Sequence, residues 1–298
     1  MRTEWRRLLP AAAERPSDME KTKMKRKKSV FTVSVALCCF LCFFIFFAGY
    51  PAEVQRDYGV FLGIDGDQME RLDGYRLVVI EPSEFQAEQI RALHAAGKMV
   101  YGYLNIGAIE EYRPYYDRFR GITLGRYEEW PDEQWVNVSA PEWQTFLVDE
   151  LGKQYAAMGL DGFFLDNADV YYHYPTEDNF QGLCAVLKGL RSWKIPLIIN
   201  GGDFFVTRCI EENTARSLFD GINQESVFTG IDFKTGRGTV QREAETRYFQ
   251  DYLRKAKDCG LSVYLLEYGA DEALAERIDS YCRESGFRWF NAEDAALR

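Results

Sequence analysis

The sequence predicts an α/β fold, a single (β/α)8 TIM barrel preceded by an N-terminal hydrophobic segment. Short β-rich runs alternate with amphipathic helical runs from Tyr58 to the C-terminus, with no linker or low-complexity break after Pro51. A hydrophobic content of 47% and an aromatic content of 15% are ample for one large core. The main alternative, an open doubly wound sheet, usually has a glycine-rich phosphate loop after its first strand, and "GIDGDQ" does not match GxGxxG.

Eight strands are expected, and their residue types are β-branched and aromatic. They are Tyr58–Ile64, Arg76–Glu81, Lys98–Ile106, Gly162–Asp166, Pro196–Asn200, Gly221–Glu225, Leu261–Glu267 and Phe287–Asn291. The helical stretches between them include Ser83–Ala96, Pro141–Met158, Asp178–Ser192 and Val240–Asp258.

Glycine marks the boundaries of these elements. Helices are expected to end at Gly97, Gly159 and Gly260, because glycine adopts the left-handed cap conformation without strain. A second signal is an Asp-Gly pair just before a strand, which is typical of a turn. Such pairs occur at Asp73-Gly74, Asp161-Gly162 and Asp220-Gly221.

The N-terminus carries a targeting signal. Residues 1–28 form a basic region that ends in "KTKMKRKK", and residues 29–50 are free of charge. Such a segment is long enough to span a bilayer, and its basic flank keeps the N-terminal side in the cytoplasm. Read from Met24 as an alternative start, it also resembles a secretory signal. Whether it is a cleaved signal peptide or a membrane anchor, residues 51–298 are expected to be extracellular or at the cell surface.

Charge and cysteine content narrow the possible ligands. The formal net charge is −10, although residues 1–50 are basic, so the remaining chain is strongly acidic. Such a body repels nucleic acid and suits a cationic ligand. Three of the seven cysteines, Cys38, Cys39 and Cys42, lie in the apolar segment, and the other four are widely spaced, with no Cys/His cluster at metal-ligand spacing. We therefore expect neither a metal site nor a disulfide framework.

Polar side chains end nearly every predicted strand. In "GLDGFFLDNADVYYHYP" an apolar strand runs directly into Asp166, Asn167 and Asp169, followed by tyrosines. In a TIM barrel the strand ends converge on one rim, where the chemistry takes place. Carboxylates and amides surrounded by tyrosines are typical of a carbohydrate site.

Two of these carboxylates form the expected catalytic pair. Glycoside hydrolysis needs one carboxyl group to protonate the leaving oxygen and a second to attack the anomeric carbon or activate water. Asp166 and Glu225 are the predicted pair, with Glu267 and Asp169 as substitutes. The same strand ends and loops supply the predicted substrate-binding residues. These are Tyr103, Asn105, Asn167, Asp169, Tyr172, Asn200, Asp203, Asn223, Gln224, Glu267 and Tyr268.

Several motifs together resemble one known family. "YGVFLGID", "VVIEP", "YGYLNIG", "GLDGFFLDNADVY", "IINGGD", "GINQES" and "YLLEYG" occur in the order found in glycoside hydrolase family 114, the endo-α-1,4-polygalactosaminidases. The resemblance implies a (β/α)8 barrel that cleaves α-1,4-linked galactosamine-containing polysaccharide without a metal or other cofactor. It also implies that Asp166 is the nucleophile and Glu225 the acid/base. Members often have a glutamate after the glycine that ends the third strand, where this chain has Ala108.

Other functions remain open at this stage. The principal alternative is an exported barrel that binds polysaccharide without cleaving it, and only loss of turnover in Asp166 or Glu225 variants separates the two. A deacetylase would need a metal-binding set of His and Asp, and the chain has only two histidines.

Overall fold

The computed structural model describes residues 56–128, 130–232 and 237–298, which fall within one compact unit, Gln55–Arg298. The predicted basic region 1–28 and hydrophobic segment 29–50 lie outside the described residues. Among the residues that are described, no helix has both the length and the apolar character needed to cross a membrane.

All eight predicted strands are present, and they form one parallel sheet in the order β1-β2-β3-β7-β8-β9-β12-β13. Their bounds are β1 (Arg56–Phe61), β2 (Tyr75–Ile80), β3 (Met99–Asn105), β7 (Gly162–Asp166), β8 (Leu197–Asn200), β9 (Gly221–Glu225), β12 (Ser262–Tyr268) and β13 (Arg288–Ala292). The last strand packs back against the first, with the rings of Phe61 and Phe290 centred 5.2 Å apart. The fold is therefore the predicted (β/α)8 TIM barrel.

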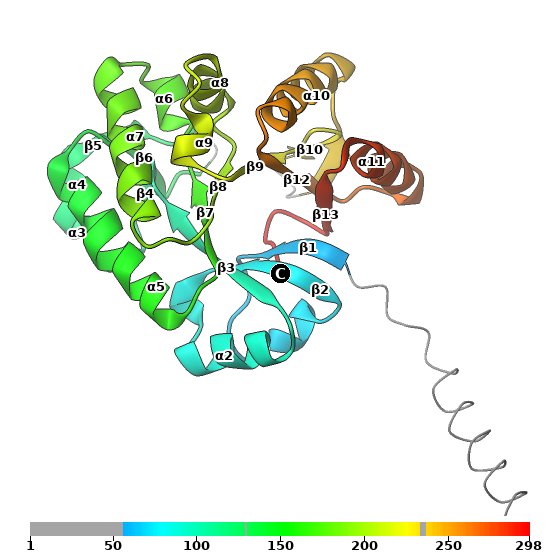
Figure 1. Cartoon of the computed structure of the whole chain (residues 1–298), viewed down its shortest axis with the longest axis horizontal. Coiled ribbons are helices and arrows are strands. Elements are labelled where there is room, and N and C mark those ends of the chain that lie inside the picture. Colours follow the sequence, from blue (N-terminus) through cyan, green and yellow to red (C-terminus); the bar gives the residue numbers. More distant parts are fainter. Residues whose placement is uncertain (1–55, 129, 233–236) are drawn as a thin grey trace, which may run out of the picture. The chain divides into compact units, whose positions relative to one another are not determined.

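Helices surround the strands on the outside (Figure 1). The principal helices are α2 (Ala87–Ala95), α4 (Pro141–Thr145), α5 (Lys153–Met158), α7 (Glu177–Arg191), α8 (Asp203–Glu211), α10 (Glu243–Asp258) and α11 (Glu272–Ser285). Short helices are α3 (Tyr116–Phe119), α6 (Val170–His173) and α9 (Ala215–Leu218). The helix expected over Pro141–Met158 differs in one respect, because a π-helical segment, Phe146–Gly152, separates α4 from α5.

Side chains alternate along the strands as the sequence pattern requires. In β7, Phe163 and Leu165 are fully buried beneath the helices, whereas Phe164 and Asp166 face the cavity at the end of the barrel. This alternation brings the catalytic candidate onto the inner face.

The predicted glycine boundaries hold for the helices. Gly97, Gly159 and Gly260 have φ of 80°, 94° and 87°, as left-handed caps do. The Asp-Gly pairs mark strand starts as predicted, since Gly74 has a φ of 78° just before β2, and Gly162 and Gly221 are the first residues of β7 and β9. A Cβ atom at Gly162 would lie 2.5 Å from the Tyr101 ring, so close packing explains this glycine.

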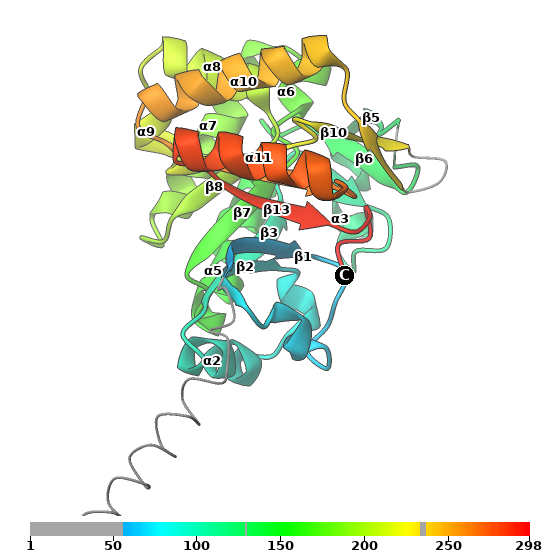
Figure 2. The ribbon, with the colours of Figure 1, turned by 90° about the vertical axis from the view of Figure 1, so that its right-hand side faces the viewer.

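Two insertions that the sequence did not predict rise from the C-terminal ends of the strands. One is an antiparallel sheet of β4 (Ala108–Glu110), β6 (Glu133–Val136) and β5 (Thr123–Arg126), which follows β3. The other is the hairpin of β10 (Thr229–Asp232) and β11 (Arg237–Val240), which follows β9. Figure 2 shows both insertions on the same side of the barrel, beyond the tip of β13.

Candidate active site

The C-terminal strand ends enclose a cavity of about 550 Å³. Adjacent parallel strands are in register there, with Asn105 opposite Asp166 and Asn200 opposite Asn223. Of the predicted residues, those that line the cavity are Tyr103, Asp166, Asn167, Asp169, Asn200, Glu225 and Tyr268. The sequence-based prediction that the strand ends meet at one rim is therefore confirmed for these residues.

Asp166 and Glu225 meet on one amide group. The Asn200 side-chain nitrogen donates to Asp166 Oδ1 at 2.8 Å and to Glu225 Oε1 at 2.7 Å. Those two oxygens are therefore no farther apart than these lengths combined, about 5.5 Å. The two carboxyl groups therefore lie close enough together for both to reach a single glycosidic bond.

Each carboxylate has a second, phenolic donor. The Tyr103 hydroxyl donates to Asp166 Oδ2 at 2.9 Å, and the Tyr268 hydroxyl donates to Glu225 Oε2 at 2.5 Å. Burial and the neighbouring carboxylates raise the pKa of both phenols well above the ordinary value. Both tyrosines are therefore un-ionised donors, and they fix the rotamers of the two acids.

A buried amide network orients Asn200 itself. Asn200 Oδ1 accepts from the Asn223 side chain at 2.6 Å, and Asn223 Oδ1 accepts from the Tyr58 hydroxyl at 3.0 Å. Asn223 is completely buried. Because the oxygen of Asn200 is engaged in this way, its NH₂ group must face the two acids.

The surroundings shift the protonation of Asp166. Burial, and secondarily the charge of Glu225, raise the pKa of Asp166 to about 6. Such a shift places the titration of this carboxyl group in the pH range where enzymes operate.

Asp169 lies beside this pair. Its Oδ2 accepts from the backbone N–H of Gly202 at 3.0 Å, which ties the loop after β7 to the start of α8. Burial first, and the charges of Asp166 and Asp203 second, raise the pKa of Asp169 to about 7.

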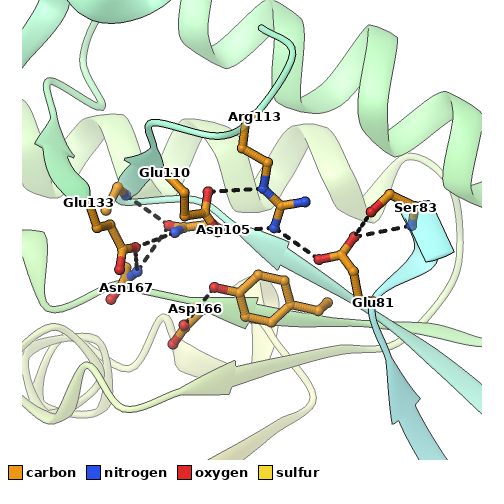
Figure 3. A network of polar contacts seen from close by, with 10 residues as sticks. Glu81, Ser83, Asn105, Glu110, Arg113, Glu133, Asp166 and Asn167 are labelled. Atoms are coloured by element: carbon orange, nitrogen blue, oxygen red, sulfur yellow. Dashed lines mark hydrogen bonds and ion pairs between the residues drawn. The ribbon is translucent and has the colours of Figure 1, made fainter. Parts of the chain in front are cut away.

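Figure 3 shows a network of further acids beside Asp166, of which Glu110 and Glu133 line the cavity. Arg113 donates to both oxygens of Glu110 and, at 2.9 Å, to Glu81. Glu133 Oε1 accepts from Asn105 at 2.6 Å and from Asn167 at 2.7 Å. Burial, then the charges of Asp166 and Glu110, raise the pKa of Glu133 to about 8. Glu133 escaped prediction because it comes from the inserted strand β6, whose position no local pattern reveals.

Other predicted substrate-binding residues lie behind or beside the cavity. Glu267 is fully buried and accepts from the backbone N–H groups of Val227, Phe228 and Thr229, so it holds the turn after β9. Gln224 donates to the Glu225 backbone carbonyl at 3.1 Å.

Asp203 accepts from the hydroxyl of Tyr248. Tyr172 is 54% exposed and packs edge-on against Phe204. It stands on α6, next to the cavity residue Asp169. Within the described ranges, no group of three or more His, Cys, Asp or Glu side chains is arranged to hold a metal ion.

Two neighbouring carboxyl groups at the C-terminal strand ends of a TIM barrel are the arrangement that two-carboxylate glycosidases use. The comparisons agree, since a model of glycoside-hydrolase family GH114 matches residues 51–292. The chain belongs to this family and is a glycoside hydrolase, which confirms the predicted family and favours the enzyme over the non-catalytic barrel.

Relatives of this chain include both sequences and structures. An uncharacterized protein of Deinococcus radiodurans is 22% identical over 227 residues, 71% of each chain. The glycoside hydrolase domain of PelA from Pseudomonas aeruginosa has a TM-score of 0.69 at 18% identity, over 81% of this chain and 96% of that chain. Aspergillus fumigatus Ega3, solved in complex with galactosamine, has a TM-score of 0.63 at 15% identity, over 84% and 95%. These structures share the fold.

Proposed function

We propose that this enzyme cleaves α-1,4-linked galactosamine-containing polysaccharide by a two-step retaining mechanism, with Asp166 and Glu225 as its catalytic acids. The observation that carries the proposal is the Asn200 amide group shared by the two carboxylates. The two oxygens that share this amide are within about 5.5 Å of each other, which suits the separation of roughly 5–5.5 Å in retaining enzymes better than the roughly 6.5–9.5 Å of inverting enzymes. The substrate class is supported by the family and by the galactosamine bound to Ega3.

In the first step Asp166 attacks the anomeric carbon while Glu225 protonates the departing glycosidic oxygen. This forms a glycosyl-enzyme ester and releases the shortened chain. In the second step Glu225 takes a proton from water, which attacks the same carbon and expels Asp166. Tyr103, Asn200 and Tyr268 hold the two acids, and each donor strengthens its bond as negative charge returns to its acceptor.

The roles of nucleophile and acid/base follow the family resemblance, since each acid receives one phenol and one amide donor. Chemical rescue assigns them. With an activated α-galactosaminide and azide, Glu225→Ala is expected to give the α-azide and Asp166→Gly the β-azide. The opposite pair of products would exchange the two roles.

The substrate assignment is tested with the purified protein and galactosamine polymers of graded N-acetylation. Mass spectrometry should show oligosaccharide fragments, and NMR of the first products should show the α-anomer. Asp166→Asn and Glu225→Gln serve as controls. If only the β-anomer forms initially, the retaining mechanism is wrong; if no polymer is cut, the substrate class is wrong.

We also propose that the enzyme acts outside the cell. The support is the charge-free segment 29–50 behind its basic flank. N-terminal sequencing of the exported protein distinguishes a cleaved signal, which leaves a new N-terminus near residue 50, from an anchor that remains in the membrane. Retention of the whole chain in the cytoplasm would contradict both.

A further inference from the structure

Two glutamates face each other across the cavity wall. In the antiparallel pair of β4 and β6, Glu110 lies directly opposite Glu133. Both are largely buried, with exposed fractions of 8% and 9%. Like charges directly opposite each other destabilise a sheet, so this pairing requires compensation.

The positive charge that offsets this repulsion is placed beside Glu110. Arg113 binds both oxygens of Glu110, at 3.1 and 3.0 Å, and its remaining contact at 2.9 Å goes to Glu81. The guanidinium is thus occupied by two carboxylates. Glu110 is therefore paired with a guanidinium cation through both of its oxygens.

Glu133 has neutral partners instead. Its side chain accepts hydrogen bonds from the amides of Asn105 and Asn167, and both reach the same oxygen, Oε1. The titratable groups around it are the carboxyls of Asp166 and Glu110 and the phenols of Tyr103 and Tyr112. A buried carboxyl group among other acids, without a cation, is most stable when protonated.

The orientation of Asn105 shows which oxygen carries the proton. Asn105 Oδ1 accepts from the backbone N–H of Ala108 at 2.9 Å and from Asn167 at 3.1 Å, so its NH₂ group must face Glu133. Two donors to Oε1 make Oε1 the carbonyl oxygen of the acid. The hydroxyl is therefore at Oε2, on a residue that lines the cavity.

We propose that Glu133 is a substrate-binding residue that works as an uncharged carboxylic acid, donating a hydrogen bond from Oε2 to an oxygen of the bound sugar. The inference rests on the proposed function and adds to it a neutral donor in a cavity otherwise rich in acids. It also explains why the chain places Arg113 against Glu110 and Glu81 alone. An arginine contact to Glu133 would ionise the acid and remove the donor.

The decisive variant is Glu133→Gln, because glutamine copies the protonated acid. Its oxygen accepts the two amide bonds, and its NH₂ group donates where the hydroxyl did. In the wild type KM should rise about tenfold per pH unit above about pH 8 as Glu133 ionises, with kcat little changed. In Glu133→Gln, KM should match the wild type at pH 6.5 and stay flat through pH 9. Glu133→Ala should raise KM at every pH.

Glu111→Gln is the matched control. Glu111 follows β4 and pairs with Gln134, but it does not line the cavity, so this variant should keep the wild-type pH profile. If Glu133→Gln retains the wild-type rise in KM, Glu133 is not its source and the proposal is overturned. If it loses affinity at pH 6.5 for amine-bearing polymer but not for N-acetylated polymer, Glu133 acts as an anion and the proposal is equally overturned.

Infrared difference spectroscopy provides a readout that needs no turnover. Wild type minus Glu133→Gln should show a protonated carboxyl band at pH 7 that disappears above pH 8. A carboxylate band at pH 7 would overturn the proposal even in an active enzyme. If instead the protonated band is present and no galactosamine polymer is cleaved, it is the proposed substrate that fails.

Discussion

Strands β7 and β9 each carry an acid at both ends, and the two ends use them differently. Asp161 and Asp220 precede the strands, and Asp166 and Glu225 end them. Asp161 accepts from the backbone N–H of Val100 at 2.8 Å and lies 2.9 Å from the His94 ring.

Asp220 repeats this arrangement at the start of β9. It accepts from the backbone N–H of Leu197 at 2.9 Å and from Arg191 at 3.1 Å. At the N-terminal ends, each acid therefore fastens the neighbouring strand. At the C-terminal ends, Asp166 and Glu225 accept mainly from two side-chain phenols and one side-chain amide, with a smaller contribution from the Asn167 backbone N–H to Asp166. The kind of hydrogen-bond partner therefore distinguishes a structural acid from a reactive one. Backbone N–H groups and basic side chains satisfy the carboxylates of Asp161 and Asp220. Neutral side-chain donors leave the carboxylates of Asp166 and Glu225 able to react.

The largest effect is expected on turnover. Asp166→Asn and Glu225→Gln should each lower kcat by roughly 10³-fold or more, because neither amide can be a nucleophile or exchange the required proton. Asp161→Asn and Asp220→Asn should stay within about twofold of the wild type. The measurement is initial rates on galactosamine polymer, with circular dichroism as a check on folding. If the variants of Asp161 and Asp220 lost as much kcat as those of Asp166 and Glu225, the proposed difference between the two strand ends would be wrong.

The pH profile should sharpen the same distinction. Since burial and Glu225 raise the pKa of Asp166 to about 6, the nucleophile becomes protonated below that pH. The rate constant kcat/KM should then fall about tenfold for each pH unit below about 6. Asp161→Asn should leave this acid limb in place, whereas Glu225→Gln should shift it to lower pH by removing the neighbouring charge. An alkaline limb near pH 6 would instead identify Asp166 as the proton donor.

The strand ends were accessible from sequence because they combine two local signals. "FFLD" joins an apolar run to an acid, and alternation then places Asp166 on the side of Phe164, as observed. Because the strands of the barrel are parallel, their C-terminal ends, and the residues on them, then lie at the same rim. Asn200 and Tyr268 were found by the same rule.

The rule fails where a residue's partner comes from a distant segment. Glu267 lies next to the C-terminal residue of β12, much as Glu225 ends β9, yet its oxygens accept from backbone N–H groups of the turn after β9. Glu133 shows the reverse case, since its role depends on pairing between β4 and β6 across the insertion. Such long-range pairing has no local sequence signature, so it emerges only in three dimensions.

The two ends should also differ in stability when their acids are removed. Asp220→Ala deletes the acceptor for the Leu197 N–H and the Arg191 contact, so the free energy of unfolding should fall by about 1–2 kcal/mol. Denaturant unfolding at pH 7 measures this, with exposed Asp258→Ala as the control. An unchanged midpoint would show that Asp220 does not fasten β8.

The smallest expected effect has the opposite sign, because Asp166→Asn should stabilise the protein at neutral pH. The pKa of Asp166 is about 6 in the folded state and about 3.9 when unfolded, so the folded state holds the proton more tightly. Stability from this group is therefore fully present below pH 3.9 and is lost as the pH rises through 6. Asparagine at position 166 cannot ionise, so the variant avoids that loss of stability. It also keeps both hydrogen bonds: its oxygen accepts from Asn200, and its NH₂ group donates to the Tyr103 hydroxyl once that hydroxyl has reoriented.

The expected gain is about 1 kcal/mol at pH 7, less than the pKa difference alone implies because one charge-assisted bond is replaced by a neutral one. The gain should vanish at pH 4, where Asp166 is protonated in the folded wild type. Unfolding curves at these two pH values measure it, with Asp220→Asn for comparison. A loss of stability at pH 7 would mean that the neutral donors satisfy Asp166 as fully as backbone amides and Arg191 satisfy Asp220. The two ends of the strands would then not differ in the free energy cost of their charge.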